Sequence, residues 1–421
     1  MRYALLDEAG HEIEGGDCKG SVDKEYLKLF PKIGNVLPFH LRDIVEVEAE
    51  NYRIKLSMES GEEVVLSNLG YDFEDFLRVL TNMRSEVIIK DLLVDEVVRK
   101  TDIEMDFIYC DENGFERAKG AGKARLYETG LIIIPERGDV FRIPYSDILK
   151  VSESNYEVKI STELGEQLVL KRMGSEREPF AEALSSVLSE LQNKAFSLTK
   201  AMFPTVDSMT LRRIANLMRE GKAVSKSYVD AIDPKIWLEM ERRIASVGLR
   251  ETYAFLKELS RQDKIAIGFK RGLMGEYIWY LIPIYGSKYK GYGNAVAMEA
   301  SEDGGGKATY FFRMVGRRDY LEYESAEELD KVADQIIKKI NRCMIDINFR
   351  REPIYLPDEK LEEQAYVKYR VAVRKVPSLK LLRNLYIGRV IHSSPEKWKK
   401  DVVDLLRFNV EASDDLAKWK K

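Results

Sequence analysis

The stretch of sequence that decides the fold occurs twice. Residues 43–86 read DIVEVEAENYRIKLSMESGEEVVLSNLGYDFEDFLRVLTNMRSE, and residues 147–190 read DILKVSESNYEVKISTELGEQLVLKRMGSEREPFAEALSSVLSE. At an offset of 104 residues and without a gap, 18 of these 44 positions are identical. The offset has the size of a whole domain, because solenoid repeats have periods of about 20–50 residues. We therefore predict two copies of one fold, at residues 1–98 and 103–195.

Each copy has the pattern of short strands followed by one helix. In the second copy, short runs rich in β-branched and aromatic residues are separated by turn signals, which is typical of strands. The predicted strands lie at 124–128, 130–135, 140–144, 147–152, 156–162 and 167–170. Apolar residues at helical spacing then predict a closing helix in each copy, near 72–86 and 176–191. We expect Phe76 and Phe180 to occupy equivalent core positions in these helices.

The middle of the second copy resembles a known superfold. The stretch RLYETGLIIIP at 125–135, followed by RIPYSDI at 142–148, is similar to the central strands of bacterial pleckstrin-homology-like (PH-like) and GRAM-like domains. The resemblance covers residues 1–192. It implies two tandem PH-like β-barrel or sandwich units, each capped by a helix. It also implies a binding or scaffolding role without fixing the ligand, because one fold hosts many functions.

The loops that would bind a lipid headgroup do not have the required charge. Phosphoinositide-binding PH domains use a basic cluster between their first two strands. In this chain the first copy has the acidic run EAGHEIEGGD at 8–17, and the second has only Arg117, Lys119 and Lys123 in a mixed loop. An acidic surface is repelled by an anionic membrane. We therefore expect a protein partner rather than lipid phosphate.

The second half of the chain is predicted to be α+β. Residues 196–262 have helical patterns and are interpreted as a linker or bundle, with a winged-helix DNA-binding element over 208–285 as the alternative. Residues 263–421 are predicted to form an antiparallel sheet with helices and a basic helical C-terminal region. Its strands are expected near 264–270, 276–285, 294–301 and 307–315, and its helices near 326–344, 358–375, 378–390 and 395–408. The run at 367–374 also alternates like a strand.

Composition and charge limit the classes of function. The 421 residues are 45% hydrophobic and 33% charged, above the usual 25% or so of charged residues, and this abundance of charge resembles that of thermophile proteins. Residues 1–194 hold 25 basic and 39 acidic side chains, whereas residues 195–421 hold 42 basic and 32 acidic ones. This asymmetry indicates either different partners for the two halves or attraction between them.

The sequence predicts a cytoplasmic location and no disulfide framework. Cys18, Cys110 and Cys343 are scattered and odd in number, which is typical of a reducing compartment. The N-terminal residues lack the apolar core of a secretory signal. No apolar run reaches the roughly 18 residues of a membrane-spanning helix.

No catalytic signature is recognisable in the sequence. The three histidines, His11, His40 and His392, lie far from one another and from the cysteines, so we expect no metal site. Paired carboxylates in a catalytic context, a nucleophile elbow and a Walker-type phosphate loop are also missing. We expect a protein that is not an enzyme and needs no cofactor. An enzymatic site within residues 260–350 stays open as an alternative.

Basic residues interleaved with aromatics provide the candidate partner-binding positions. Between residues 365 and 400 there are ten basic residues and one acidic residue, Glu396. Such a stretch suits contacts with nucleic-acid phosphates and bases, and it equally suits docking onto the acidic half. The candidates from this stretch are Lys368, Arg370, Arg374, Lys375, Lys380 and Arg383, and those from the loop at 285–294 are Lys288, Tyr289, Lys290 and Tyr292.

The leading interpretation is a non-enzymatic, cytoplasmic binding or scaffold protein that makes protein–protein contacts through its tandem PH-like units. The alternative is a nucleic-acid-associated protein that contacts phosphate through the basic C-terminal region.

Overall fold

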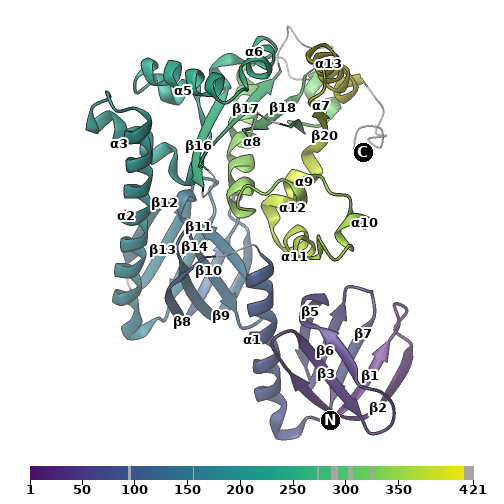
Figure 1. The fold of residues 1–421 in the computed structure, drawn as a ribbon. Helices are drawn as coiled ribbons and strands as arrows, with labels where there is room; N and C mark the ends of the chain where they lie inside the picture. Colours follow the sequence, from purple (N-terminus) through teal and green to yellow (C-terminus); the bar gives the residue numbers. More distant parts are fainter. Residues whose placement is uncertain are drawn as a thin grey trace. The chain divides into compact units, whose positions relative to one another are not determined.

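A computed structural model of the chain describes residues 1–92, 96–154, 156–272, 275–285, 293–301, 307–322 and 326–411. The fold is α+β, its sheets are antiparallel, and the chain divides into two compact units (Figure 1). The first unit comprises Met1–Ile143, Ile148–Leu184 and Leu361–Val376. The second comprises Pro144–Asp147, Ser185–Lys360 and Pro377–Lys421. The segment Leu361–Val376 thus packs with the first unit, although the chain on both sides of it belongs to the second.

The first unit contains two seven-stranded sheets with the same topology. The strand order is β4-β3-β2-β1-β7-β6-β5 in repeat 1 and β11-β10-β9-β8-β14-β13-β12 in repeat 2. The strands of repeat 1 are β1 (Arg2–Leu6), β2 (Glu12–Val22), β3 (Tyr26–Pro31), β4 (Leu37–His40), β5 (Ile44–Glu50), β6 (Arg53–Met58) and β7 (Glu63–Ser67). Those of repeat 2 are β8 (Val98–Cys110), β9 (Glu116–Tyr127), β10 (Gly130–Pro135), β11 (Phe141–Pro144), β12 (Ile148–Ser154), β13 (Glu157–Thr162) and β14 (Gln167–Lys171).

The strand register of the two repeats is also the same at the offset of 104. Tyr3 lies opposite Leu66 in repeat 1, and the corresponding pair in repeat 2 is Phe107 with Leu170. The β-bulge that follows Ile44 recurs after Ile148. A one-residue slip would turn every side chain to the other face, so an identical register means an identical core pattern. The duplication predicted from the sequence is confirmed.

The repeat extends beyond the segment in which sequence identity is high. The Asp7 carboxylate accepts hydrogen bonds from the backbone N–H groups of Ala9 and His11, two and four residues later. Asp111, 104 residues further on, accepts the same two bonds from Asn113 and Phe115. Side-chain acceptance of this kind is how aspartate stabilises a tight turn. The first hairpin of each repeat is therefore built in the same way.

Each repeat is followed by a helix, α1 (Phe73–Asp91) or α2 (Arg177–Met202). Phe180 in α2 is fully buried, as expected, but Phe76 in α1 is only half-buried. Repeat 1 places the ring of Phe73 in its core, where repeat 2 has Arg177, and Phe76 lies at the rim close to Gly20. The expectation that Phe76 and Phe180 occupy equivalent core positions is therefore wrong.

The second unit is built on a six-stranded sheet with the order β15-β16-β17-β18-β19-β20. Its strands are β15 (Val224–Ser225), β16 (Ala266–Gly272), β17 (Gly275–Ile284), β18 (Ala295–Ala300), β19 (Ala308–Arg313) and β20 (Tyr386–Ile391). The described helices of the unit beyond α2 are α3 (Ser208–Leu217), α4 (Lys226–Asp230), α5 (Pro234–Ser246), α6 (Arg250–Glu258), α7 (Arg317–Glu322), α8 (Ala326–Asp346), α9 (Glu352–Tyr355), α10 (Asp358–Leu361, which ends at the boundary between units), α12 (Pro377–Leu385) and α13 (Pro395–Glu411).

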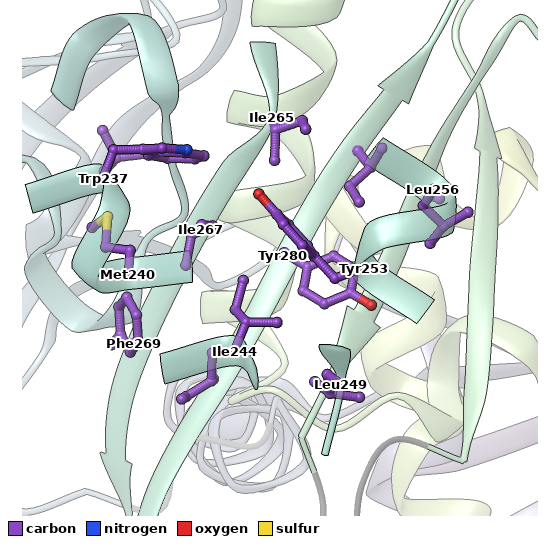
Figure 2. Close-up of a cluster of buried hydrophobic side chains, with 14 of the residues drawn as sticks. Trp237, Met240, Ile244, Leu249, Tyr253, Leu256, Ile265, Ile267, Phe269 and Tyr280 are labelled. Atoms are coloured by element: carbon purple, nitrogen blue, oxygen red, sulfur yellow. The ribbon is translucent and has the colours of Figure 1, made fainter. Parts of the chain in front are cut away.

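The core of the second unit lies between this sheet and helices α5, α6 and α13. Figure 2 shows Trp237 and Met240 of α5 and Tyr253 of α6 against Ile267 of β16 and Tyr280 of β17. Side chains on alternate positions of β16 and β17 face this core, as expected for a sheet with one face toward a helix. Among the described residues, the structure contains no helix that is long and apolar enough to cross a bilayer.

Two predicted elements near the C-terminus differ in the structure. The helix expected at 378–390 ends at Leu385, and the next residues form β20, which pairs with β19 at the edge of the sheet. The run from Tyr386 to Ile391 is rich in β-branched and aromatic residues, and Gly388 has a φ of 154°, so strand pairing is stronger than helix propensity there. The alternating run at 367–374 is not a strand but most of helix α11 (Val367–Lys375).

Candidate partner-binding surface

The site begins at a short turn between β4 and β5. The 3-10 turn at Leu41–Asp43 is anchored by the buried side chains of Leu41 and Ile44. The backbone carbonyl of Asp43 accepts a hydrogen bond from the N–H of Glu59, over 2.8 Å, which brings two acidic residues to one corner of the repeat. We call Asp43 and Glu59 the acidic corner. Two neighbouring carboxylates repel each other, so the corner favours a cation between them.

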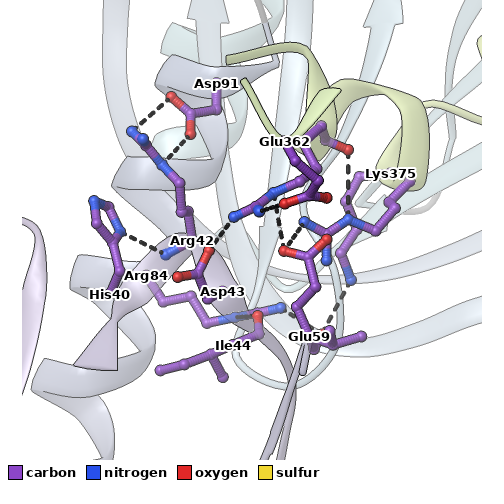
Figure 3. Close-up of polar contacts among 12 residues, drawn as sticks. His40, Arg42, Asp43, Ile44, Glu59, Arg84, Asp91, Glu362 and Lys375 are labelled. Atoms are coloured by element: carbon purple, nitrogen blue, oxygen red, sulfur yellow. Dashed lines mark hydrogen bonds and ion pairs between the residues drawn. The ribbon is translucent and has the colours of Figure 1, made fainter. Parts of the chain in front are cut away.

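Helix α11 supplies these cations (Figure 3). Arg370 Nε lies 2.9 Å from Glu59 Oε2, and the same guanidinium pairs with Asp43. Arg374 Nη2 lies 2.7 Å from the same Glu59 oxygen. The two arginines are four residues apart, so they project from one face of the helix. Arg370 also pairs, through Nη1 at 2.8 Å, with Glu362 of its own segment.

A third cation of α11 contacts the start of β5. Lys375 Nζ lies 2.8 Å from both carboxylate oxygens of Asp139 and donates a hydrogen bond to the Val45 carbonyl over 3.1 Å. Arg84 of α1 donates to the carbonyls of Ile44 and Val45 at 3.0 and 2.7 Å and pairs with Asp139. The carbonyls beside the acidic corner are thus satisfied by cationic side chains.

Desolvation dominates the electrostatics of the corner. Burial raises the pKa of Glu59, and the nearby charges of Arg374 and Arg370 only partly offset this effect. Burial likewise lowers the pKa of Arg84, against the attraction of Asp139. These charges lie in a contact that is partly shielded from water. Forming such an ion pair costs desolvation energy, and removing one partner leaves the other charge buried and unpaired. The arrangement can hold a cationic helix.

The equivalent position in repeat 2 also binds an arginine. The turn at Tyr145–Asp147, which belongs to the second unit, carries Asp147 where repeat 1 has Asp43. Arg342 Nη1 of α8 lies 3.0 Å from Asp147 Oδ2, and Lys222 Nζ lies 3.7 Å from Oδ1. The side chains of Asp147 and Arg342 are only 5% and 8% exposed, so this pair is fully internal.

The structure separates the ten candidate residues from the sequence into three groups. Arg370, Arg374 and Lys375 come together on repeat 1, and Lys368 lies in the same helix. Lys380 and Arg383 lie in α12 of the second unit. Lys380 is exposed, whereas Arg383 donates to the carbonyls of Pro353 and Leu356 and pairs with Asp358. The loop candidates Lys288, Tyr289, Lys290 and Tyr292 lie outside the described residues.

Sequence reasoning missed the acidic side of this surface, namely Asp43, Glu59, Asp139 and Glu362. It also missed Lys222 and Arg342, which fall outside the basic stretch. One signal was available, because aspartate occurs at both 43 and 147 and glutamate at both 59 and 163 in the repeat. Asp43 and Glu59 lie in different turns that a backbone hydrogen bond brings together, so the repeated carboxylates could have indicated this corner.

A separate polar cluster lies in the core of the second unit. Glu299 of β18 is completely buried, and its Oε2 contacts the hydroxyl of Thr309 and, at 3.1 Å, Nε2 of His392. Trp398 donates its indole N–H to the same threonine oxygen. Burial raises the pKa of Glu299 more than the hydrogen bond with His392 lowers it. Over the described part of the chain, no group of three or more His, Cys, Asp or Glu side chains is placed to hold a metal ion.

No family model matches the chain, and no curated protein matches it either. Among solved structures, the chain is similar to one described as the Spt16D Pob3N heterodimer, with 16% sequence identity over 38% of this chain and 82% of that chain. The TM-score of this match is 0.16.

Proposed function

We propose that this chain is a non-enzymatic binding scaffold whose two PH-like repeats hold helical protein segments at the turn before their fifth strand. The observation that carries the proposal is the equivalence of two ion pairs, Asp43 with Arg370 and Asp147 with Arg342. Two unrelated helices, α11 and α8, use the same position of the same fold. A position that twice pairs with an arginine from a helix of its own chain is well suited to bind an arginine-bearing helix from another protein.

The nucleic-acid alternative has less support. Phosphate binding needs Lys and Arg side chains that can neutralise phosphates and so release the counterions condensed on the nucleic acid. Arg370, Arg374 and Lys375 instead pair with carboxylates of their own unit. We also propose a reducing, cytoplasmic location, because Cys18, Cys110 and Cys343 are all free thiols.

Affinity purification of the full-length protein from its native host tests this function. We expect a defined protein partner with the wild type that is lost with Asp43→Lys/Glu59→Lys. The matched control is Glu12→Lys/Glu50→Lys, which makes the same change in charge at exposed positions of β2 and β5. An identical set of co-purified proteins with all three forms, or a nucleic acid as the only co-purified molecule, would contradict the proposal.

A further inference from the structure

We propose that the segment Leu361–Val376 is an internal ligand of the acidic corner, and that an external partner binds there by displacing it. The partner is a protein helix with two arginines four residues apart followed by a lysine, as in Arg370, Arg374 and Lys375. This inference rests on the proposed function and names the partner and the regulation of the same site.

The position of the segment in the chain allows it to leave. Leu361–Val376 packs with the first unit, whereas the residues before it and after it, Lys360 and Pro377, belong to the second. None of the six strands of the second unit lies within the segment. Pro377, which begins α12, cannot extend the hydrogen bonding of α11, so the two helices are separate elements. Release of the segment therefore requires no strand of the second unit to separate from its neighbours.

The contact combines charge with an apolar face, which defines the chemistry of the partner. Val371 is buried and lies beside Arg374 and Lys375 on the helix surface, because residues three or four apart in a helix are neighbours. A competitor must present guanidinium groups and apolar side chains on one continuous helix surface. Nucleic acid and inorganic anions cannot do this, and an anion would be repelled by Asp43 and Glu59. An amphipathic basic helix meets both requirements.

The geometry of the charges makes the internal contact displaceable. Arg370 Nε and Arg374 Nη2 both approach the single oxygen Oε2 of Glu59, at 2.9 and 2.7 Å, so two cations share one acceptor atom. A partly buried ion pair offsets its desolvation cost only when its geometry is excellent. A partner helix whose arginines form well-aligned hydrogen bonds with the same carboxylates would bind them more strongly than α11 does.

The segment also carries a carboxylate that can stay with its arginine on release. Glu362 pairs with Arg370 at 2.8 Å and lies in the same segment. When α11 leaves the corner, this pair can move with it, so Arg370 does not lose every counter-charge. Against this, tethering gives the segment a high effective concentration at the corner, which a partner must overcome. We expect weak binding of a partner to the wild type and strong binding once the segment is disabled.

The test uses the full-length protein and a fluorescein-labelled peptide with the sequence of residues 361–376. The variant Arg370→Glu/Arg374→Glu disables the internal ligand and leaves the corner intact. We expect fluorescence anisotropy to show peptide binding to this variant at least tenfold tighter than to the wild type. Adding Asp43→Asn/Glu59→Gln to this variant should abolish peptide binding. Lys397→Glu/Lys400→Glu, which changes the charge equally at exposed positions of α13, should behave like the wild type.

A peptide with the same composition but adjacent arginines tests the spacing. Equal binding of this peptide would overturn the assignment of a helix with arginines four residues apart. If the Arg370→Glu/Arg374→Glu protein is folded by circular dichroism but does not bind the peptide, displacement is wrong. The proposed function would then still stand if Asp43→Lys/Glu59→Lys loses a protein partner in the purification experiment.

Hydrogen exchange on the wild type provides a measurement that needs no variant to fold. Local opening exposes amides at a lower free energy than global unfolding does. We expect the amides of α11 to exchange faster than those of α12 and β20, and added peptide to accelerate this exchange further. If the amides of α11 exchange no faster than those of the sheet, the proposal is wrong.

Discussion

Asp43 and Asp147 are 104 residues apart, end the same turn in two copies of one fold, and each form an ion pair with an arginine from a later helix. The two pairs differ in burial. Arg370 is 15% exposed and Asp43 is 35% exposed, whereas both members of the Asp147–Arg342 pair are below 10%. One position of the fold is thus used once for a contact that water can reach and once for a contact inside the core.

This difference predicts unequal costs of removing the arginine. Arg342→Met removes the guanidinium that pairs with the buried carboxylates of Asp147 and Asp346, so we expect a loss of about 3–5 kcal/mol in the free energy of unfolding. Arg370→Met should cost less, about 1.5–3 kcal/mol, because Asp43 can be solvated. Urea unfolding of the two variants measures both values. Equal losses would show that the difference in burial does not control the strength of the pairs.

The helices that follow the two repeats should also differ in their sensitivity to truncation. Phe180 is fully buried, so Phe180→Ala should lower the free energy of unfolding by about 3–5 kcal/mol. Phe76→Ala removes a half-buried ring at the rim and should cost clearly less. Leu80→Ala and Leu184→Ala, at equivalent and fully buried positions, are the matched pair and should cost similar amounts. A larger loss for Phe76→Ala than for Phe180→Ala would contradict this account of the cores.

Glu299 should make the second unit less stable as the pH rises. Burial raises its pKa in the folded state, so folding favours the protonated form. The stabilisation from this proton is complete below the unfolded pKa of about 4.3 and is lost as the pH rises through the folded pKa. Glu299→Gln should therefore gain melting temperature relative to the wild type as the pH increases from about 4 to 8.

Glu241 provides a control, because its pKa is shifted in the direction opposite to that of Glu299. Burial acts against its ionisation, but hydrogen bonds from Lys257 and Tyr253 outweigh it and lower the pKa of this carboxyl. The stability that it contributes is present above the unfolded pKa and is lost as the pH falls. Glu241→Gln should therefore be least harmful at acid pH. Parallel melting curves for the two variants at every pH would refute both assignments.

Nucleic acid should not bind to the basic region of the wild type. Arg374 and Lys375 are paired with Glu59 and Asp139, so they have no free charge to offer to phosphates. In gel-shift assays at about 50 mM salt, where phosphate contacts are strong, we expect no complex with single- or double-stranded DNA or RNA. Arg374→Glu/Lys375→Glu should instead lower the melting temperature. A complex that weakens steeply with salt, and is lost in this variant, would favour the nucleic-acid alternative.

Much of the first half of the fold could be predicted from sequence, because its strands have local signals and the two copies of the repeat support each other. The alternation of Tyr156, Val158 and Ile160 marks a strand within six residues, and the strand found there is β13 (Glu157–Thr162). The offset of 104 then carries each assignment to the other copy. The helix at 326–346 and the helix that begins at Pro234 after Asp233 were also predictable, because their signals are periodicity and capping.

The remaining features depend on contacts between residues far apart in the chain. Tyr386–Ile391 becomes a strand because β19 offers it an edge, which no window of local sequence can reveal. The acidic corner depends on Arg370 reaching Asp43 across more than three hundred residues. The basic stretch marks cations such as Arg370, but nothing local shows which carboxylates they meet.

The late position of α11 in the chain has a consequence for biosynthesis. Repeat 1 is complete in sequence when Asp91 has been added, but Arg370 is translated 311 residues after Glu59. At about 5–20 residues per second, the ribosome needs roughly 15–60 s to cover this distance. A newly made first repeat therefore spends this time with its carboxylates open to other basic helices in the cell. Any partner that competes with α11 has its best opportunity on the nascent chain, before the tethered competitor exists.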